Sequence, residues 1–547
     1  MADADLVFTG GKVFTADAVR STATAVAVSG DRIVAVGYDE IFDLVGPATE
    51  VVDLEGGLLV PGFIDAHVHP VWGGLDMTRC DLSALTTQRQ YLQRIGEYAA
   101  ENPRDDWILG GGWSMSAFAG GTPTALALDA VLSDRPVFLP NRDGHGAWVN
   151  SRALELAGVT RDTPDPDDGR IERSADGTPS GTLHEGAMAL VSRLLPFATD
   201  EAMVQALQVG QAYLHSFGIT GWQDAIVGTA ADSGDVGPAY RTVSERGQLT
   251  GRVVGALWWD RTRGVEQIPE LVAQRASLSH GHFRATSIKI MQDGVAENFT
   301  AAMTEPYCDG HGHSTDNSGI SFVEPALLNE AAIALDALGF QLHFHAIGDR
   351  AVRECLDAVQ AANSTNGRRD ARHHIAHLQV VHPDDIPRFR QLGVVANMQS
   401  YWAALEPQMV DLTLPFLGEK RSAWQYPFGD LLRSGATLAA GSDWSVSTPD
   451  PLAAMHVAVN RVIPVAHQEA EYGTFLPEQR LDLATSLAAY TAGSAFVNHA
   501  DDTGRITVGA LADLAVLNRD PFEHPVDEIA EARVVQTFVG GSRVFAS

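Results

Sequence analysis

The stretch Pro61-Gly62-Phe63-Ile64-Asp65-Ala66-His67-Val68-His69 decides the fold prediction. An apolar run enters through Pro-Gly and ends on His-x-His, which is typical of a buried strand with polar residues at its carboxyl end. Side chains alternate along a strand with period two, so His67 and His69 project to the same side. Two neutral imidazoles held in this way make half of a divalent-metal site. A His-x-His pair alone is a weak signal, and Asp65 and the Pro-Gly entry strengthen it.

The body of the chain contains eight apolar segments of strand length, counting this one. Most are separated by stretches with helical periodicity, such as residues 325–338 and 350–362. Eight alternations of β and α segments predict an α/β fold, a (β/α)8 TIM barrel with a parallel sheet. The predicted strands are residues 62–67, 219–225, 252–258, 286–291, 340–346, 372–378, 394–400 and 436–443.

Four further polar residues fall in or at the ends of these segments. His345 ends the fifth strand, His377 the sixth and Asp443 the eighth, and Lys289 lies in the fourth. Each has an ordinary alternative, because a strand-end histidine often bonds a carbonyl and Gly-Ser-Asp often caps a helix. Carboxyl ends of barrel strands meet at one face, so the four together predict one site there.

Two parts of the chain lie outside the barrel pattern. Residues 1–60 and 500–547 alternate in short β-like runs with Gly turns, which predicts a small β-sandwich built from both termini. Residues 61–499 are predicted to hold the barrel. Its first two strands are too far apart for one helix, so residues 70–215 are predicted to form an inserted, substrate-covering domain after the first strand. This segment is too rich in Leu, Trp and Phe for a disordered linker.

Composition excludes several classes of protein. A net charge of −31 argues against binding nucleic acid or an anionic membrane surface, because phosphates attract basic patches. The sequence has neither a membrane-length apolar run nor a basic stretch before an apolar one at its start. Three cysteines, Cys80, Cys308 and Cys355, are too few and too scattered for a disulfide framework. We therefore expect a reduced, cytoplasmic protein that acts on a small molecule, with a homodimer as a further expectation.

Lysine is rare in this chain. Of the 38 basic residues only Lys12, Lys289 and Lys420 are lysines, so surface cations are arginines. The two side chains are not interchangeable, and Lys289 inside an apolar strand calls for a lysine-specific explanation. A buried ammonium is costly and cannot bind a cation. The alternative is an ion pair of Lys289 with Asp293 or Asp443.

The chain resembles a known family, the amidohydrolase superfamily. Within it the chain resembles the YtcJ-like (amidohydrolase 3) group, which includes N-substituted formamide deformylases. The resemblance spans essentially the whole sequence. The stretches that carry it are 61–69, Arg142-Asp143-Gly144-His145 with Val149-Asn150-Ser151, 179–185, Lys289 with Asp293-Gly294, 345–349, 441–443, and Gly504-Arg505-Ile506 with Gly509 and Ala512-Asp513-Leu514.

The resemblance implies a metal site. It implies that His67, His69, His345, His377 and Asp443 surround one or two divalent ions, zinc being the first choice. It also implies that Lys289 is carboxylated and bridges a metal pair. Asp443 is expected to be the general acid/base, and His377 or a metal to polarise the carbonyl.

Four residues are predicted to bind substrate. His145 is either a substrate contact or a polar loop residue. Trp113, after three glycines, either shapes an apolar pocket or packs in a core. Glu185 and Asp293 lie within the resembling stretches.

Some positions depart from the group's pattern. Ala376 stands where the group usually has Glu, residues 295–300 are not Ser-rich, and His343 is an additional histidine two residues before His345. These changes leave the ligand set whole and leave the substrate open. The expected reaction is hydrolysis of a C–N bond, amide, N-acyl or N-formyl. The alternatives are carbamate, deaminase or lactone chemistry on the same metal, or a non-catalytic regulatory scaffold.

Overall fold

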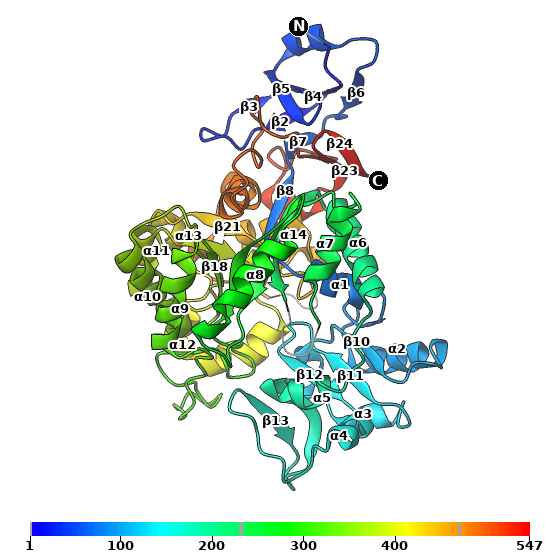
Figure 1. The fold of residues 1–547 in the computed structure, drawn as a ribbon, viewed down its shortest axis with the longest axis vertical. Coiled ribbons are helices and arrows are strands. Elements are labelled where there is room, and N and C mark those ends of the chain that lie inside the picture. The colour runs from blue at the N-terminus through cyan, green and yellow to red at the C-terminus, as the bar shows by residue number, and fades with distance from the viewer. Residues whose placement is uncertain (1–2, 229–233, 469–471) are drawn as a thin grey trace.

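The computed structural model describes residues 3–228, 234–468 and 472–547. Its centre is an eight-stranded parallel sheet that is nearly closed into a barrel, as predicted (Figure 1). The strands follow chain order around the sheet: β8 (Phe63–Val68), β15 (Ile219–Val227), β16 (Arg252–Trp258), β17 (Phe283–Met291), β18 (Gln341–Ala346), β19 (His374–His377), β20 (Val395–Met398) and β21 (Leu438–Ala440). All eight predicted strands are confirmed.

Hydrogen bonds just beyond β21 bring the first and last strands together. The amide N of Asp443 donates to the carbonyl of His67 at 2.8 Å, and that of His69 to Trp444 at 2.7 Å. Gly441 permits the approach, because a Cβ there would lie 2.6 Å from the His67 amide nitrogen. The barrel is thus joined at the carboxyl ends of β8 and β21.

Helices cover the outside of the barrel, and the core lies between them and the strands. They are α1 (Pro70–Asp76), α6 (Asp200–Ser216), α7 (Gly237–Glu245), α8 (Ile268–Leu278), α9 (Pro325–Ala337), α10 (Asp349–Asn366), α11 (Ile386–Leu392), α12 (Leu414–Ser422), α13 (Phe428–Arg433), α14 (Pro451–Asn460), α15 (Leu483–Ala488) and α16 (Ser494–Val497). Of the ranges described, no helix is both long and apolar enough to cross a bilayer.

Two sheets at one end of the barrel combine the two ends of the chain. One has the order β5 (Arg32–Gly37), β4 (Ala25–Ser29), β1 (Leu6–Thr9), β6 (Glu50–Asp53). The other has the order β24 (Ser542–Ala546), β23 (Val534–Val539), β22 (Leu514–Leu517), β7 (Leu58–Pro61), β2 (Lys12–Phe14), β3 (Thr22–Ala23). Phe8 and Phe538 pack edge to face in the shared core, with ring centroids 5.0 Å apart. Residues 1 and 2 of the predicted sandwich lie outside the described ranges.

The segment between β8 and β15 forms a third sheet at the opposite end of the barrel (Figure 1). Its order is β13 (Gly169–Arg173), β14 (Pro179–Glu185), β12 (Gly146–Val149), β11 (Val137–Pro140), β10 (Ile108–Gly111), β9 (Cys80–Asp81). The accompanying helices are α2 (Gln88–Glu101), α3 (Ala125–Asp129), α4 (Ser151–Ala157) and α5 (Ala189–Ser192). Since β8 runs away from the terminal sheets, this sheet lies at the carboxyl ends of the barrel strands. The exact limits of the three predicted domains stay a prediction.

Candidate functional site

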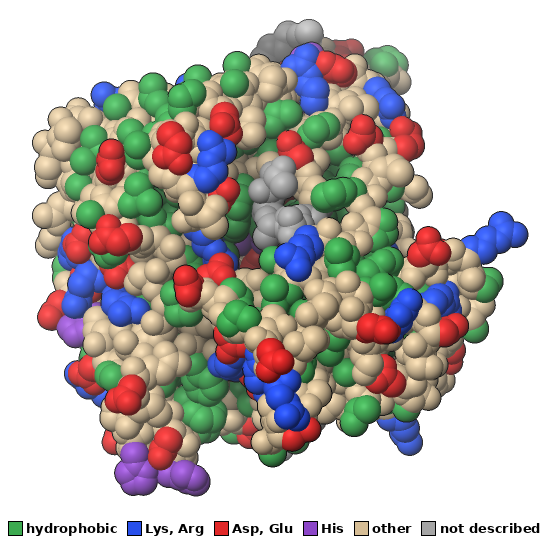
Figure 2. Space-filling view, turned by 60° about the horizontal axis from the view of Figure 1, so that its bottom comes forward, with side chains coloured by type: hydrophobic (Ala, Val, Ile, Leu, Met, Phe, Trp, Pro, Cys, Tyr) green, Lys and Arg blue, Asp and Glu red, His purple; other side chains and the backbone are tan. Residues whose placement is uncertain are grey.

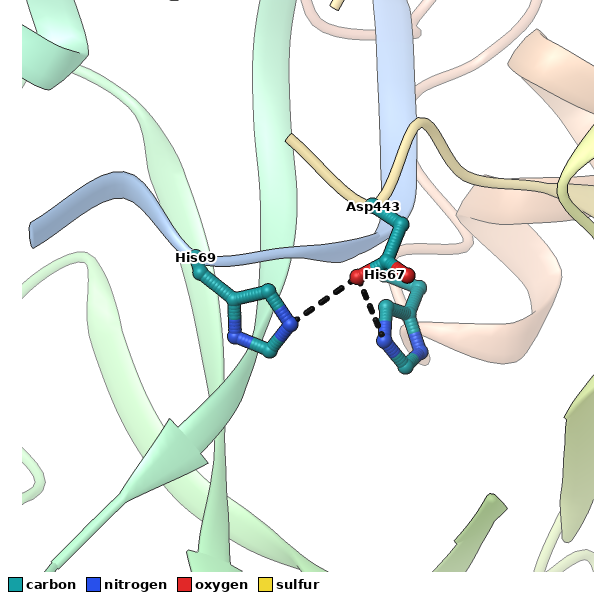
Figure 3. Close-up of side chains that lie close together, drawn as sticks. All are labelled: His67, His69 and Asp443. Atoms are coloured by element: carbon teal, nitrogen blue, oxygen red, sulfur yellow. Dashed lines mark hydrogen bonds and ion pairs between the residues drawn. The ribbon is translucent and has the colours of Figure 1, made fainter. Parts of the chain in front are cut away.

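Two histidines converge on one carboxylate oxygen at the carboxyl end of β8 (Figure 3). The Nε2 atoms of His67 and His69 lie 3.2 Å and 3.0 Å from Oδ1 of Asp443. Among the described residues these three form the one group of His, Cys, Asp or Glu ligand atoms that all lie within 4.8 Å of one another. The structure thus brings the His-x-His motif and the eighth strand together.

The other predicted ligands surround this group. His377 Nδ1 lies 3.8 Å from Asp443 Oδ2, and Lys289 Nζ lies 3.5 Å from His67 Nε2. The ring centroid of His377 is 4.7 Å from that of His67 and 4.4 Å from that of His345. All six predicted ligands therefore lie in one cluster, contributed by β8 and the residue after it, by β17, β18 and β19, and by the segment after β21.

Burial sets the protonation of the histidines. It lowers the pKa of His67 to about 3, with Lys289 adding to the effect, and lowers the pKa of His345 and His377 well below the usual value. Burial raises the pKa of Asp443, but His67, His69 and His377 outweigh it and hold that pKa well below its usual range. The cluster thus holds neutral His67, His345 and His377 beside an ionised Asp443 at neutral pH.

These residues fit a divalent cation. Neither of the buried ring nitrogens of His377 has a hydrogen-bond partner within the described ranges. A buried polar atom without a partner is unfavourable, and a cation would satisfy such lone pairs. Imidazole nitrogen with one carboxylate is a donor set that suits zinc.

A second ion pair, formed by two residues of the third sheet, lies beside the cluster. His145 Nδ1 lies 2.9 Å and 3.1 Å from the two carboxylate oxygens of Glu185, which also accepts from Thr300 Oγ1 at 2.8 Å. Burial lowers the pKa of His145, but Glu185 outweighs it and raises the pKa to about 9. The His145 ring centroid is 5.5 Å from that of His345, so this charged pair faces the candidate site.

The two remaining predicted substrate contacts have partners inside the protein. Asp293 is fully buried and accepts from the backbone N–H groups of Ala302, Ile347 and Gly348 at 2.8–3.0 Å. Its Oδ1 lies 3.3 Å from His345 Nδ1, so it orients a candidate ligand. Trp113 is fully buried and packs against other aromatic rings, and its indole N–H donates to the Leu139 carbonyl at 2.7 Å. The structure therefore does not place Asp293 or Trp113 as substrate contacts.

Sequence reasoning missed two residues of the site. Asp224 on β15 is fully buried and bonded to Tyr240 Oη at 2.7 Å; burial raises its pKa to about 6, which His69 opposes. The same rule that found His345, a polar residue at a strand end, would have found Asp224. Trp402 stacks on His377 with ring centroids 5.3 Å apart and planes 2° from parallel. Nothing in its local sequence indicates this contact.

Three site residues have left-handed backbone. The φ angles of His377, Asp443 and Glu185 are +79°, +57° and +50°. Such a conformation is unfavourable for a residue with a side chain, by about 1–3 kcal/mol, and persists where the surroundings enforce it. Strain of this kind gathers at functional sites, and here it occurs at three of the predicted site residues.

The family assignment rests on comparison with known proteins. A family model described as "Amidohydrolase family" matches residues 50–545. The chain belongs to this family. The resemblance seen in the sequence motifs is thereby confirmed.

Several named relatives match this chain over nearly their whole length. Protein LONG AFTER FAR-RED 3 of Arabidopsis thaliana is 31% identical over 99% of this chain and 92% of its own. The putative amidohydrolase YtcJ of Bacillus subtilis is 28% identical over 98% and 99%, respectively. An N-substituted formamide deformylase of Arthrobacter pascens is 28% identical over 98% and 97%.

A solved structure supports the same assignment. An uncharacterized metal-dependent hydrolase from Pyrococcus furiosus is 25% identical, with a TM-score of 0.70 over 94% of this chain and 99% of its own. Family and structural neighbour together support a hydrolase with an amidohydrolase fold.

Proposed function

We propose that this chain hydrolyses a C–N bond of a small amide, N-acyl or N-formyl compound, using a divalent metal. The observation that carries the proposal is the convergence of His67 Nε2 and His69 Nε2 on Asp443 Oδ1 at the carboxyl end of the barrel. Active sites of TIM-barrel enzymes lie at this face. The kinship with an N-substituted formamide deformylase supports the C–N bond as the target.

The ion would be held by His67, His69 and Asp443, and we propose zinc because the donors are imidazoles and one carboxylate. His345 and His377 border the same space and are the candidate ligands of a second ion. A divalent ion bound there supplies a hydroxide nucleophile at neutral pH and polarises a carbonyl oxygen.

Asp443 is the candidate general base. Its Oδ1 is engaged by His67 and His69, whereas Oδ2 lies 3.8 Å from His377 Nδ1. Oδ2 is thus the oxygen that takes the proton of water and returns it to the leaving nitrogen. His377, neutral and held by stacking on Trp402, has a ring N–H to offer to the substrate carbonyl.

Lys289 is proposed to be carboxylated. Burial lowers the pKa of Lys289 to about 8, although Asp443 and Asp224 oppose it, so roughly a tenth of the amine is uncharged at pH 7, far more than for an exposed lysine. The nitrogen lone pair then attacks the carbon of CO2, an N–C bond forms as one C=O π bond breaks and its electron pair moves to oxygen, and the nitrogen loses one proton to water, which leaves a carbamate anion. Such an anion offers oxygen ligands where an ammonium offers none. A 13C resonance of a carbamate in protein equilibrated with labelled bicarbonate, absent from Lys289→Met, tests this.

The proposed reaction is tested by metal content and a substrate panel. Wild-type protein is expected to retain about one or two zinc ions per chain and to hydrolyse at least one of an N-substituted formamide, an N-acyl amino acid, a carbamate or a lactone. Replacing His67 and His69 together by Ala should abolish both zinc binding and activity. His456→Ala, which changes a buried histidine of α14, should retain both.

The panel also separates the alternatives. If only the carbamate or only the lactone is hydrolysed, the same metal site cleaves that bond rather than an amide or formamide bond. A relative that is 30% identical over 80% of this chain is named an exoenzymes regulatory protein. A non-catalytic, regulatory role is therefore the second candidate function. Folded wild-type protein without zinc binding or turnover of any compound would support that role and overturn the proposal.

A further inference from the structure

The barrel interior behind His67 is polar. His343 on β18 and His374 on β19 are both fully buried there. Branched apolar side chains usually fill this part of a TIM barrel. Buried polar groups need partners, so the hydrogen bonds of these two histidines carry information.

His343 contacts the inner nitrogen of His67. Nδ1 of His67 lies 2.7 Å from Nε2 of His343, and the rings meet edge to face with centroids 4.7 Å apart. The outer nitrogen of His67, Nε2, lies 3.2 Å from Asp443 Oδ1 and 3.5 Å from Lys289 Nζ. One nitrogen of His67 therefore faces the candidate cation site and the other faces His343.

His343 is in turn held from behind by His374, whose ring centroid lies 4.0 Å from its own. The ring of His374 is fixed at both nitrogens. Gln223 uses its amide N–H2 to donate to Gln341 and to Asn498, so its oxygen accepts from His374 Nε2–H at 2.9 Å. Asn397 donates to His374 Nδ1 at 3.1 Å and to the Ala66 carbonyl at 2.9 Å. This network leaves the His343 ring little freedom to move away from His67.

The direction of the bond between the two rings follows from the site. If His343 donated, His67 would carry its proton on Nε2 and point it at the cation. If His67 Nδ1–H donates, Nε2 presents a lone pair to the cation, and His343 Nε2 is the acceptor. His343 then carries its own proton on Nδ1, a buried atom without a hydrogen-bond partner in the described parts of the chain.

We propose that His343 is a positioning residue, whose Nε2 accepts the Nδ1–H of His67 and holds His67 in the tautomer that binds metal through Nε2. The inference rests on the metal site of the proposed function. The partner that accepts the far N–H of a metal-bound histidine fixes its tautomer and ring orientation, and losing such a partner weakens metal affinity roughly 10- to 100-fold. His343 thus acts through His67 rather than on substrate.

The test compares zinc affinities of two variants with that of the wild type, by competition with a chromophoric chelator. His343→Phe keeps a ring against His374 and removes the acceptor, and its Kd for zinc should rise roughly 10- to 100-fold. His343→Gln offers an oxygen acceptor and should recover most of this loss. His456→Phe, the same substitution at a buried histidine of α14, should match the wild type. The absorption spectrum of the cobalt-substituted protein should change in His343→Phe and return toward the wild type in His343→Gln.

The outcomes separate this inference from the proposed function. A wild type that binds no zinc overturns the proposed function and this inference with it. A folded His343→Phe that binds zinc as tightly as the wild type overturns the inference alone. If His343→Phe does not fold, His343→Leu removes the acceptor with a smaller side chain, and the same comparison applies. Equal losses of zinc affinity in His343→Gln and in the variant without an acceptor would also contradict the inference.

Discussion

At the scale of single residues, Lys289 differs from the other two lysines of the chain in its burial. All three lysines of the chain lie in the described ranges, and the side chains of Lys12 and Lys420 are 49% and 61% exposed, whereas Lys289 is 3% exposed. A buried amine among histidines and acids destabilises the fold when it is protonated. Its retention there is consistent with a chemical task rather than with stability.

The pKa of Lys289 predicts how stability depends on pH. Burial lowers that pKa from 10.5 to about 8, so between these values the unfolded chain binds a proton that the folded chain does not. Unfolding free energy contributed by Lys289 should therefore rise as the pH increases from about 8 to about 10.5. In metal-free, CO2-free buffer, the unfolding free energy of the wild type relative to that of Lys289→Met should be lowest below pH 8. This difference should then increase in favour of the wild type as the pH rises above 8. Urea unfolding at pH 7, 8 and 9.5 measures the difference. A difference that is constant over this range would contradict the assigned shift.

Asp443 permits a direct test of acid/base chemistry. Asp443→Asn keeps the shape of the side chain and one oxygen toward His67 and His69 but cannot accept the proton of water. Activity per bound metal ion should fall roughly 10²- to 10⁴-fold, the range typical of a lost general acid or base. Turnover normalised to zinc content is the measurement. Unchanged turnover per zinc would remove Asp443 from the proton transfer.

At the scale of elements, the ends of the strands decide where the site forms. β19 stops at His377 and β21 stops three residues before Asp443, shorter than the predicted strands, because His377, Leu378 and Asp443 have left-handed backbone. The backbone after each strand places the side chains of His377 and Asp443 together at the barrel mouth. Asp293 then ties the loops after β17 and β18 together through three backbone N–H groups.

The His145–Glu185 pair lies within the third sheet, contacts the loop after β17 through Thr300, and should be pH-sensitive. Glu185 raises the pKa of His145 to about 9 against the effect of burial, so the stabilisation is complete below the unfolded value of 6.5 and is lost as the pH rises through about 9. His145→Gln should therefore lower the unfolding free energy at pH 6 by about 1.5–3 kcal/mol, as for a hydrogen bond to a charged group, and by less at pH 9.5. Denaturant unfolding at the two pH values measures this. Equal losses would show that the charge of His145 does not stabilise the fold.

At the scale of the whole molecule, charge is the dominant surface property. The chain carries 69 acidic and 38 basic residues, and on the face shown in Figure 2 acidic and basic side chains are interspersed. Many ion pairs join them, but exposed pairs contribute little to stability. The excess of negative charge repels itself in the folded state.

Salt should therefore stabilise this protein. Raising NaCl from 20 mM to 500 mM shortens the range of repulsion between surface carboxylates, and Tm should increase by a few degrees. Differential scanning fluorimetry at several salt concentrations, with sorbitol as a nonionic control, measures the effect. A fall in Tm with salt would mean that the surface ion pairs outweigh the net repulsion.

The sequence by itself determined the architecture and most of the cluster. Strand-length apolar runs and a count of eight are local patterns, and the carboxyl ends of parallel strands must meet, so His67, His345, His377 and Asp443 could be expected in one place. The rarity of lysine identified Lys289. These properties depend on residue type and spacing, which the sequence states directly.

Only the tertiary structure decided what each side chain faces. Trp113 packs in a core, Asp293 binds three backbone N–H groups, and Trp402 joins the site without a local signal. His343 stands two residues from His345, yet it meets the inner nitrogen of His67 on another strand. Such contacts depend on register and rotamer between distant segments, which arise only when the barrel closes.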